Sequence, residues 1–373
     1  MFKKHAKSII FHNPDYHCTF FYRAELQKLG WKADIFVSDS YPRNLLYSEK
    51  EVISAPKYTK NPKINYLIWF LINIPKYKYI FYYGRPPNFS NTFKKLGINT
   101  EYDPLFMFLK LFSKKIIYLP SGCRDEFTKK AFSLFDNGKI CGNCGFFDRC
   151  DEESNIKNLS LVNKYVDLVI GLGFTNSKLN QLKNLKWKSF DLDIFNSNIM
   201  IPDEFLLPKN GSFRILHSTS LQGRESNDKN IKGSKYVINA VAKLKNEGYN
   251  CELINTESVH IKNMRYIQAQ ADLVIDQLIY GHWGSSSLEG IALGKPVICY
   301  FNKEWKINYL RNFSIDVWPF IEADTTSIYD VIKNLLDNPR LILEYSRLST
   351  EFATKYLNIE SNAKEFVGYL ESI

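Results

Sequence analysis

"ADLVIDQLIYGHWGSSSLEGIALGKPVICY", residues 271–300, carries the pattern that decides the fold. An apolar run (272–278) leads through a glycine-broken loop into a helical pattern (285–293), and a second apolar run (295–301) follows. Two strand-length runs with a helix between them predict a βαβ unit with parallel strands. Glu289 stands among small apolar residues in that helix. It is therefore either the exposed carboxylate of an amphipathic helix or a ligand-binding group.

The same alternation extends over all 373 residues, a length that suits two domains. We expect an α/β protein of two doubly wound, Rossmann-like domains, 1–195 and 212–340, joined by a proline-containing linker at 196–211. Helices over 341–373 are expected to pack back on the first domain. The expected strands are 8–11, 33–38, 79–84, 114–122, 166–173, 187–193, 213–219, 251–257, 272–278 and 295–301, and the expected helices are 18–30, 64–72, 233–248, 262–271 and 285–293.

Charge is distributed unevenly along the chain, whose formal charge is +10. Residues 1–120 hold 19 Lys+Arg and 8 Asp+Glu, a balance of +11, so the remainder is nearly neutral. A basic half suits an anionic partner such as a membrane surface, a phosphorylated lipid, an acidic glycan or a nucleic acid. The sequence has no recognisable signal peptide and no apolar run of spanning length. We expect a cytoplasmic protein, either free or peripheral at the inner face of the cell membrane.

The aromatic and basic stretch 56–89 has two interpretations. Its lysines flank a centre rich in Trp, Phe and Tyr, as in helices that lie in a membrane interface. The interpretation that we favour is a core helix and a buried strand with a basic rim. Weak membrane association through that rim is the second interpretation.

Polar and basic residues follow the first strand of the second domain, in "ILHSTSLQGRESNDKNIKGSKYVINAV" (215–241). The strand ends in His217 and Ser218, Arg224 lies in the loop, and Lys232 precedes a long helix. Cations at a strand–loop–helix junction can meet a diphosphate, because the helix N-terminus adds backbone donors. For any one of these residues alone, an ordinary solvated loop is the better explanation.

The start of the helix at 285–293 has the same character. Gly284 lets the backbone approach a ligand closely. The serines Ser285, Ser286 and Ser287 can cap the helix or donate to phosphate oxygens. Glu289 follows in the first turns, where its carboxylate can accept hydrogen bonds from two ribose hydroxyls. The combination favours a nucleotide-sugar site.

Residues 213–300 resemble the C-terminal domain of GT-B fold glycosyltransferases, near family 4. "LEGIALGKPVI" is similar to the end of the family's Glu-x7-Glu motif, and Arg224 and Lys232 fall where the family binds the donor diphosphate. The resemblance implies a nucleoside-diphosphate-sugar donor with its ribose on Glu289, bound in a cleft between two domains. It also implies retaining transfer to a glycan or lipid-linked acceptor in surface polysaccharide or glycoconjugate biosynthesis.

The chain departs from the family at the first Glu of that motif, which contacts the donor sugar. Gly281 stands eight positions before Glu289. His282, Gln277 and Asp276 are candidates to replace the missing carboxylate, and the sequence does not rank them. His282 is included among the expected donor-binding residues. The departure keeps a second function open, a GT-B protein that binds a nucleotide without transferring a sugar.

The N-terminal domain of GT-B enzymes binds the acceptor. Here the first strand runs into "FHNPDYHC" (11–18). Its polar residues His12, Asp15 and His17 are candidate acceptor-binding residues, although ordinary loop residues explain each of them equally well.

A second polar segment, "LPSGCRDE" (119–126), also follows a strand of this domain. Arg124 suits an acceptor phosphate or an acidic sugar. The carboxylates of Asp125 and Glu126 are the candidate catalytic groups, as a base toward the acceptor.

Four of the seven cysteines are near one another in the sequence, in a loop at about 123–150. Cys141 and Cys144 form a Cys-x2-Cys pair, Cys150 follows, and Cys123 lies just after the preceding strand. Four thiolates in a reducing compartment suit one structural zinc ion. An iron–sulfur cluster, a redox pair and free thiols are the alternatives. We expect no catalytic metal ion. A zinc-containing nucleic-acid-binding protein is a further alternative function, suggested by the net charge and the cysteines, but the basic residues are dispersed and no nucleic-acid motif is present, so we expect no nucleic-acid partner.

Overall fold

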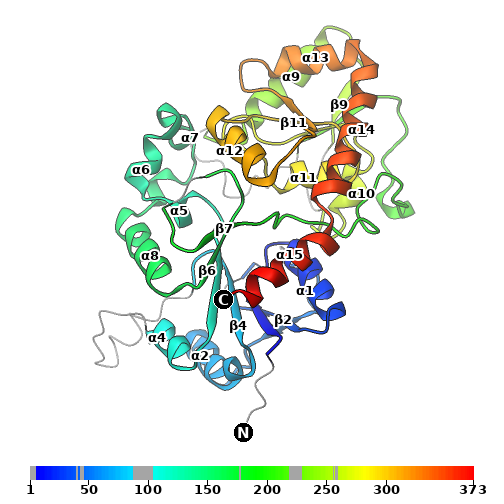
Figure 1. Ribbon diagram of the computed structural model, residues 1–373. Helices are drawn as coiled ribbons and strands as arrows, with labels where there is room; N and C mark the ends of the chain where they lie inside the picture. Colours follow the sequence, from blue (N-terminus) through cyan, green and yellow to red (C-terminus); the bar gives the residue numbers. More distant parts are fainter. Residues whose placement is uncertain are drawn as a thin grey trace.

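The computed structural model describes residues 6–38, 41–42, 46–86, 104–175, 178–217, 229–254, 256 and 259–373. Figure 1 shows two sheets, one in each half of the molecule, with helices packed around them. The predicted class, two doubly wound α/β domains, is confirmed. Within the described residues, no helix combines the length and the apolar character that crossing a bilayer requires.

The first sheet has seven parallel strands in the order β3-β2-β1-β4-β5-β6-β7. Alternate residues of its central strands enter two different core clusters: Phe11 and Phe81 one, Ile10 and Ile80 the other. Both faces are therefore buried, which is why these strands read as continuous apolar runs. The strands are β1 (Ser8–His12), β2 (Lys32–Val37), β3 (Val52–Ser54), β4 (Tyr79–Tyr83), β5 (Lys115–Leu119), β6 (Leu168–Gly171) and β7 (Leu182–Asn184).

The helices of this half cover both faces of the sheet. Helix α1 packs on the face that carries Phe11, and α2, α4 and α8 pack on the face that carries Ile10. The Cys-rich loop folds into short helices. The helices are α1 (Cys18–Lys28), α2 (Pro62–Asn73), α4 (Pro104–Leu111), α5 (Cys123–Glu126), α6 (Lys129–Ser133), α7 (Lys139–Gly142) and α8 (Glu152–Tyr165), with 3₁₀ turns at Ile74–Lys76, Phe135–Gly138 and Phe147–Arg149.

The second sheet has five parallel strands in the order β12-β11-β10-β8-β9. Its strands are β8 (Phe213–Leu216), β9 (Cys251–Leu253), β10 (Leu273–Ile275), β11 (Val297–Cys299) and β12 (Phe320–Glu322). Its helices are α9 (Ser234–Asn246), α10 (Met264–Gln268), α11 (Ser285–Ala292), α12 (Lys303–Phe313), α13 (Ile328–Asp337) and α14 (Pro339–Tyr356), and a 3₁₀ turn lies at Asp203–Phe205.

The last helix, α15 (Ile359–Glu371), returns to the first sheet (Figure 1). Phe366 packs edge-on against Trp187 and Tyr22. The hydroxyl of Tyr79 in β4 donates to the carbonyl of Leu370 over 2.7 Å. The end of the chain thus completes the core of the half in which the chain begins.

The strand expected at 187–193 is wrong. Strand β7 lies earlier, and the later segment forms only an isolated bridge between Phe190 and Asn358. The physical reason is the side chain of Trp187, which stacks on Tyr22 and Phe81 inside the core. The segment is therefore apolar because it covers the sheet face and not because it extends the sheet.

Candidate functional site

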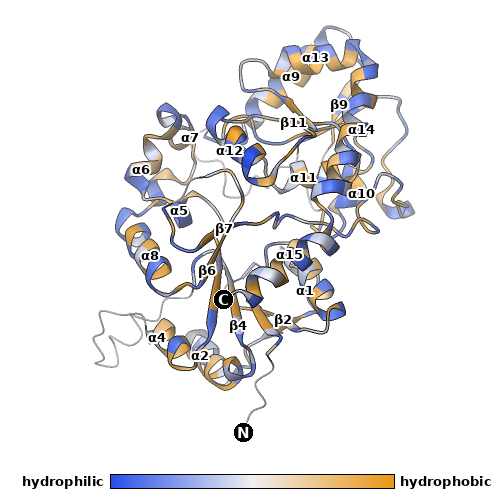
Figure 2. Ribbon diagram, viewed as in Figure 1, coloured by the Kyte–Doolittle hydropathy of each residue, from blue (hydrophilic) through white to orange (hydrophobic). Residues whose placement is uncertain are grey.

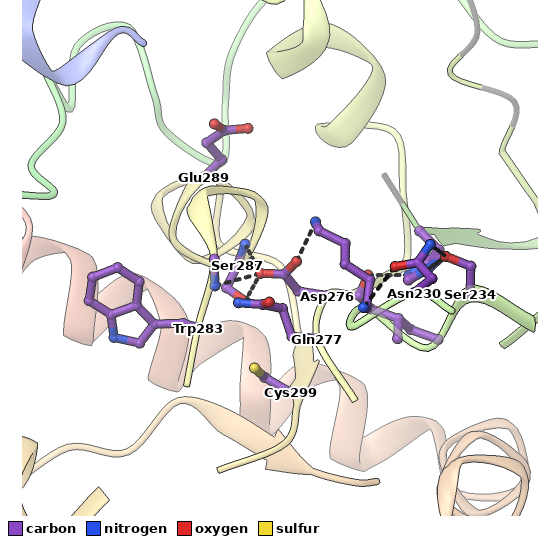
Figure 3. Close-up of polar contacts among 12 residues, drawn as sticks. Asn230, Ser234, Asp276, Gln277, Trp283, Ser287, Glu289 and Cys299 are labelled. Carbon is purple, nitrogen blue, oxygen red and sulfur yellow. Dashed lines mark hydrogen bonds and ion pairs between the residues drawn. The ribbon is translucent and has the colours of Figure 1, made fainter. Parts of the chain in front are cut away.

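The helix α11 starts beside a buried carboxylate. Asp276, directly after β10, is fully buried and accepts hydrogen bonds from the Gly284 amide and the Ser287 hydroxyl, each over 2.7 Å (Figure 3). A Cβ on Gly284 would lie 2.7 Å from the Asp276 carboxylate, so only glycine fits there. Asp276 therefore fixes the loop before α11 and the first turn of the helix.

The same carboxylate forms an ion pair with Lys232, whose Nζ lies 2.7 Å from Oδ1. Both side chains are buried. Burial alone would raise the pKa of Asp276, but the charge and hydrogen bond of Lys232, with the donors of Ser287 and Gly284, lower it overall. An ammonium group has three donors, so Lys232 can serve Asp276 and a phosphate together.

His217, predicted to bind the donor, is tied to the second domain through both ring nitrogens. Nδ1 lies 2.9 Å from the Ile275 carbonyl oxygen and Nε2 lies 3.0 Å from the Ser234 hydroxyl. Burial, and then the charge of Lys232, lower the pKa of His217 to about 4, so the ring is neutral. Ser218 and Arg224 lie outside the described residues.

Glu289 lies at the contact between the two halves of the chain. Gln268 in α10 donates to Oε2 over 2.9 Å, and Nδ1 of His17 lies 3.7 Å from Oε1. Burial raises the pKa of Glu289 to about 7, although the Gln268 hydrogen bond and the charges of Lys188 and Lys232 lower it. Burial lowers the pKa of His17 to about 3, so a neutral imidazole meets this carboxyl group.

Two polar atoms beside Glu289 have no hydrogen-bond partner among the residues that the structure describes. They are Nε2 of His17 and Oε1 of Gln268, and both residues are buried. Buried polar atoms are nearly always hydrogen-bonded in proteins, so this cluster is short of partners. His17, expected on the acceptor side, therefore lies next to the predicted ribose ligand, and Gln268 is a site residue that the sequence did not reveal.

A second connection between the halves centres on Lys188. Its Nζ contacts Asp15 Oδ2 over 2.6 Å and Ser285 Oγ over 3.4 Å, and Trp187 Nε1 donates to Asp15 over 3.1 Å. Burial alone would lower the pKa of Lys188, but Asp15 outweighs that effect and raises it. Asp15, expected to bind the acceptor, is thus fully buried as the partner of a cation at the start of α11.

The other two candidates to replace the missing family Glu, Gln277 and His282, already have partners. Gln277 Nε2 donates to the His282 carbonyl over 3.0 Å, and the His282 ring stacks on Phe174 of the first half. Gly281 has φ +95°, and a Cβ there would meet Asn302 at 3.1 Å. The backbone conformation therefore strains any side chain at this position and disfavours a carboxylate there. Ser286 is partly exposed, beside the engaged Ser285 and Ser287.

On the acceptor side, Asp125 is held by internal partners. It is buried and accepts from the Ser121 hydroxyl over 2.6 Å and from Arg85 Nε over 3.1 Å. Arg124 is exposed, and its carbonyl accepts a hydrogen bond from Arg85. Glu126 accepts from the Thr175 hydroxyl, and burial raises the pKa of Glu126 to about 7. Glu126 is thus the better placed of the two carboxylates for proton transfer.

His12 lies in the core of the first half. Its ring packs against Phe36, Tyr66 and Tyr82, and burial lowers its pKa to about 3. Its role in acceptor binding stays a prediction, which this position does not support.

The four clustered cysteines are free thiols in the structure. Burial, and then the neighbouring Cys144, Cys141 and Cys150, raise the pKa of Cys123 to about 12. Across the described residues, which include all four, no group of three or more His, Cys, Asp or Glu is placed to hold a metal ion. Zinc therefore stays a prediction. About one zinc per chain, in protein purified without a histidine tag, is the result that would establish it.

The Cys-rich loop contacts the second half of the chain. Phe135 stacks on Trp305 with ring centroids 4.5 Å apart, and Lys139 Nζ lies 3.9 Å from the centre of the Tyr300 ring. Together with Phe174 on His282, which lies in the loop before α11, these contacts hold the first half against the second.

Comparisons with known proteins identify the fold. No family model and no curated protein matches the sequence. HepE from Anabaena, solved with UDP-glucose, has a TM-score of 0.63 at 13% identity, over 98% of this chain and 100% of that one. Sucrose-phosphate synthase from Thermosynechococcus elongatus gives 0.62 at 13%, over 98% of each chain. A glycosyltransferase from Rickettsia africae gives 0.60 at 13%, over 99% of this chain and 98% of that one. The chain therefore has the GT-B fold, as its sequence resemblance predicted.

Proposed function

We propose that this protein transfers a glycosyl group from a nucleoside-diphosphate sugar to a glycan or lipid-linked acceptor. The observation that carries the proposal is the buried carboxyl group of Glu289 between the two halves of the chain, beside the unpartnered atoms of His17 and Gln268. A ribose has two neighbouring hydroxyls, each a donor and an acceptor, which are the partners that this cluster lacks.

The diphosphate would lie at the start of α11. Lys232 reaches this place from the second half of the chain, and Lys188 reaches it from the first. Asp276 already occupies the amides of Gly284 and Ser287, so the ammonium groups of Lys232 and Lys188 and the Ser285 hydroxyl are the groups that would contact a phosphate. Phosphates bind well where a helix N-terminus and basic side chains converge.

The acceptor would enter from the first half of the chain, near α5. Glu126, whose pKa is about 7, can exchange a proton near neutral pH, which suits a group that assists an acceptor hydroxyl. The exposed Arg124 suits an acceptor that carries a phosphate or an acidic sugar. Retention of configuration is proposed from the resemblance to family 4.

A second candidate function is nucleotide binding without transfer. It is favoured by Gly281, because this position lacks the carboxylate that family 4 enzymes place against the donor sugar and its left-handed backbone disfavours one. Without that contact a donor could bind through its nucleotide alone.

A donor screen separates the two functions. UDP-glucose is the first donor to test, because HepE was solved with it, and GDP-, ADP- and dTDP-sugars follow. We expect one donor class to release its nucleoside diphosphate in the presence of glycan or lipid-linked acceptors, with a glycosylated product. If nucleotides bind but no donor releases its nucleoside diphosphate with any acceptor class tested, glycosyl transfer is contradicted. Nucleotide binding without transfer is then the function that remains.

A further inference from the structure

Helix α2 is apolar on the side that faces away from the protein. Ile64, Leu71 and Ile72 are 38%, 42% and 54% exposed, while Trp69 and Phe70 on the opposite side are buried in the core. With the half-buried Leu67 and Ile68, the outward residues follow the i, i+3, i+4, i+7, i+8 spacing of one helix face. The interpretation of this segment as a wholly buried core helix is therefore only half correct.

Helix α4 continues the same surface. The two helices lie side by side (Figure 1), and Phe70 of α2 meets Phe108 of α4 with ring centroids 6.3 Å apart. On α4 and the residue after it, Met107, Leu111 and Phe112 are 47%, 79% and 42% exposed. Figure 2 shows both helices as mainly hydrophobic. We call the outward surface of Ile64, Leu67, Ile68, Leu71, Ile72, Met107, Leu111 and Phe112 the α2–α4 face.

Basic residues flank α2 on both sides along the chain. Lys57 and Lys60, just before α2, are exposed, and Lys76 lies just after its end. An apolar surface with exposed lysines at its edge is complementary to a surface that is apolar inside and anionic at its edge. Exposed apolar patches rimmed by polar residues mark contact surfaces.

We propose that the α2–α4 face docks on an anionic lipid bilayer, with its apolar residues below the headgroups and its lysines among them. The apolar residues supply buried area, and the lysines supply attraction to anionic lipid, which are the two contributions that hold interfacial helices on membranes. The face lies at the end of the first half that is remote from the second sheet (Figure 1). Docking on a bilayer would therefore not cover the contact between the halves. Docking is independent of glycosyl transfer.

The test is co-sedimentation of the full chain with vesicles. Mixed phosphatidylglycerol–phosphatidylcholine vesicles at low salt should bind the protein at least tenfold more tightly than pure phosphatidylcholine vesicles, because each lysine near an anionic surface contributes roughly fivefold. Salt should weaken this binding. Lys57→Glu/Lys60→Glu should remove most of the preference for anionic lipid.

The apolar part is tested by Leu71→Ser/Ile72→Ser, which should weaken binding to the mixed vesicles by about tenfold or more. Leu343→Ser is the matched control, because Leu343 is 72% exposed on α14 in the second half, and it should bind as the unchanged protein does. Equal melting temperatures establish that all three proteins are folded.

Three results would overturn the proposal. In the first, the unchanged protein stays in the supernatant with anionic vesicles at low salt. In the second, Leu343→Ser loses as much vesicle binding as Leu71→Ser/Ile72→Ser. In the third, light scattering would find an oligomer that Leu71→Ser/Ile72→Ser dissociates while vesicle binding is unaltered, which would make the face an interface between copies of this chain.

Discussion

Replacing Lys232 with methionine should lower the free energy of unfolding by about 3–5 kcal/mol. Methionine keeps the length of the side chain and removes its charge. Asp276 would then stay fully buried with the donors of Gly284 and Ser287 but without a cation. A buried carboxylate without its counter-charge is strongly destabilising, because the low-dielectric interior cannot replace the lost attraction. Denaturant unfolding at neutral pH measures the change.

Two further variants make this result specific. Lys235→Met removes an exposed lysine three positions later, at the second residue of α9, and should change stability by less than about 0.5 kcal/mol. Lys232→Met/Asp276→Asn should recover part of the loss, since no unpaired charge remains, with a coupling energy of about 1–3 kcal/mol. If Lys232 also holds the diphosphate, the double variant regains stability without regaining nucleotide affinity. Normal stability of Lys232→Met would refute the buried ion pair.

Replacing Glu289 with glutamine should change binding and stability in opposite directions. The carboxylate can accept hydrogen bonds from both ribose hydroxyls, whereas a glutamine amide has only one acceptor oxygen. Loss of a charged hydrogen bond costs about 1.5–3 kcal/mol, so nucleotide affinity should fall about tenfold to a hundredfold. The free protein, by contrast, should become more stable at pH 8, because the variant no longer buries a charge. Titration calorimetry and denaturant unfolding measure the two effects.

The pH dependence of that stability follows from the raised pKa of Glu289, about 7 against an ordinary 4.5. The folded state holds this proton more tightly than the unfolded state. The free energy of unfolding of the unchanged protein therefore falls as pH rises from about 4.5 to about 7, by up to about 3 kcal/mol. Glu289→Gln lacks this contribution, so its advantage should be full above pH 7 and vanish toward pH 4.5. Nucleotide binding by the unchanged protein should strengthen over the same range as the carboxylate ionises.

The control for this variant is Glu304→Gln, which changes an exposed carboxylate at the start of α12 and should alter neither property. A Glu289→Gln protein that loses stability at pH 8 and binds nucleotide normally would show that the carboxyl group has a structural role alone.

Much of the fold was predictable because the information is local. The apolar runs of β1, β4, β8, β10 and β11 each lie within a few residues, and burial on both faces makes them continuous. The exception at 187–193 has a non-local cause. Trp187 stacks on Tyr22 and Phe81, which are distant in the sequence. No local pattern distinguishes a residue buried by such packing from a residue of a buried strand.

Only the residues that the second half of the chain contributes to the candidate site were predictable from the sequence. Glu289 and Lys232 lie in recognisable strand–loop–helix junctions, but their partners come from elsewhere. His17 reaches Glu289 across 272 positions of the chain, and Lys188 reaches Ser285 across 97. A single lysine or histidine carries no sequence signal for such a contact. The role of Asp276 was open for the same reason, since only the structure shows that internal donors engage its carboxylate.

We expect the second half of the chain to bind a nucleotide-sugar donor at Glu289. Titration calorimetry with UDP, GDP, ADP and dTDP, on the unchanged protein at pH 8, measures this binding. At least one of the four should bind with one site per chain, and at a hundred times its Kd it should add about 2.7 kcal/mol to stability. Heat of dilution alone from all four nucleotides, with an unchanged melting temperature in each, would contradict this expectation.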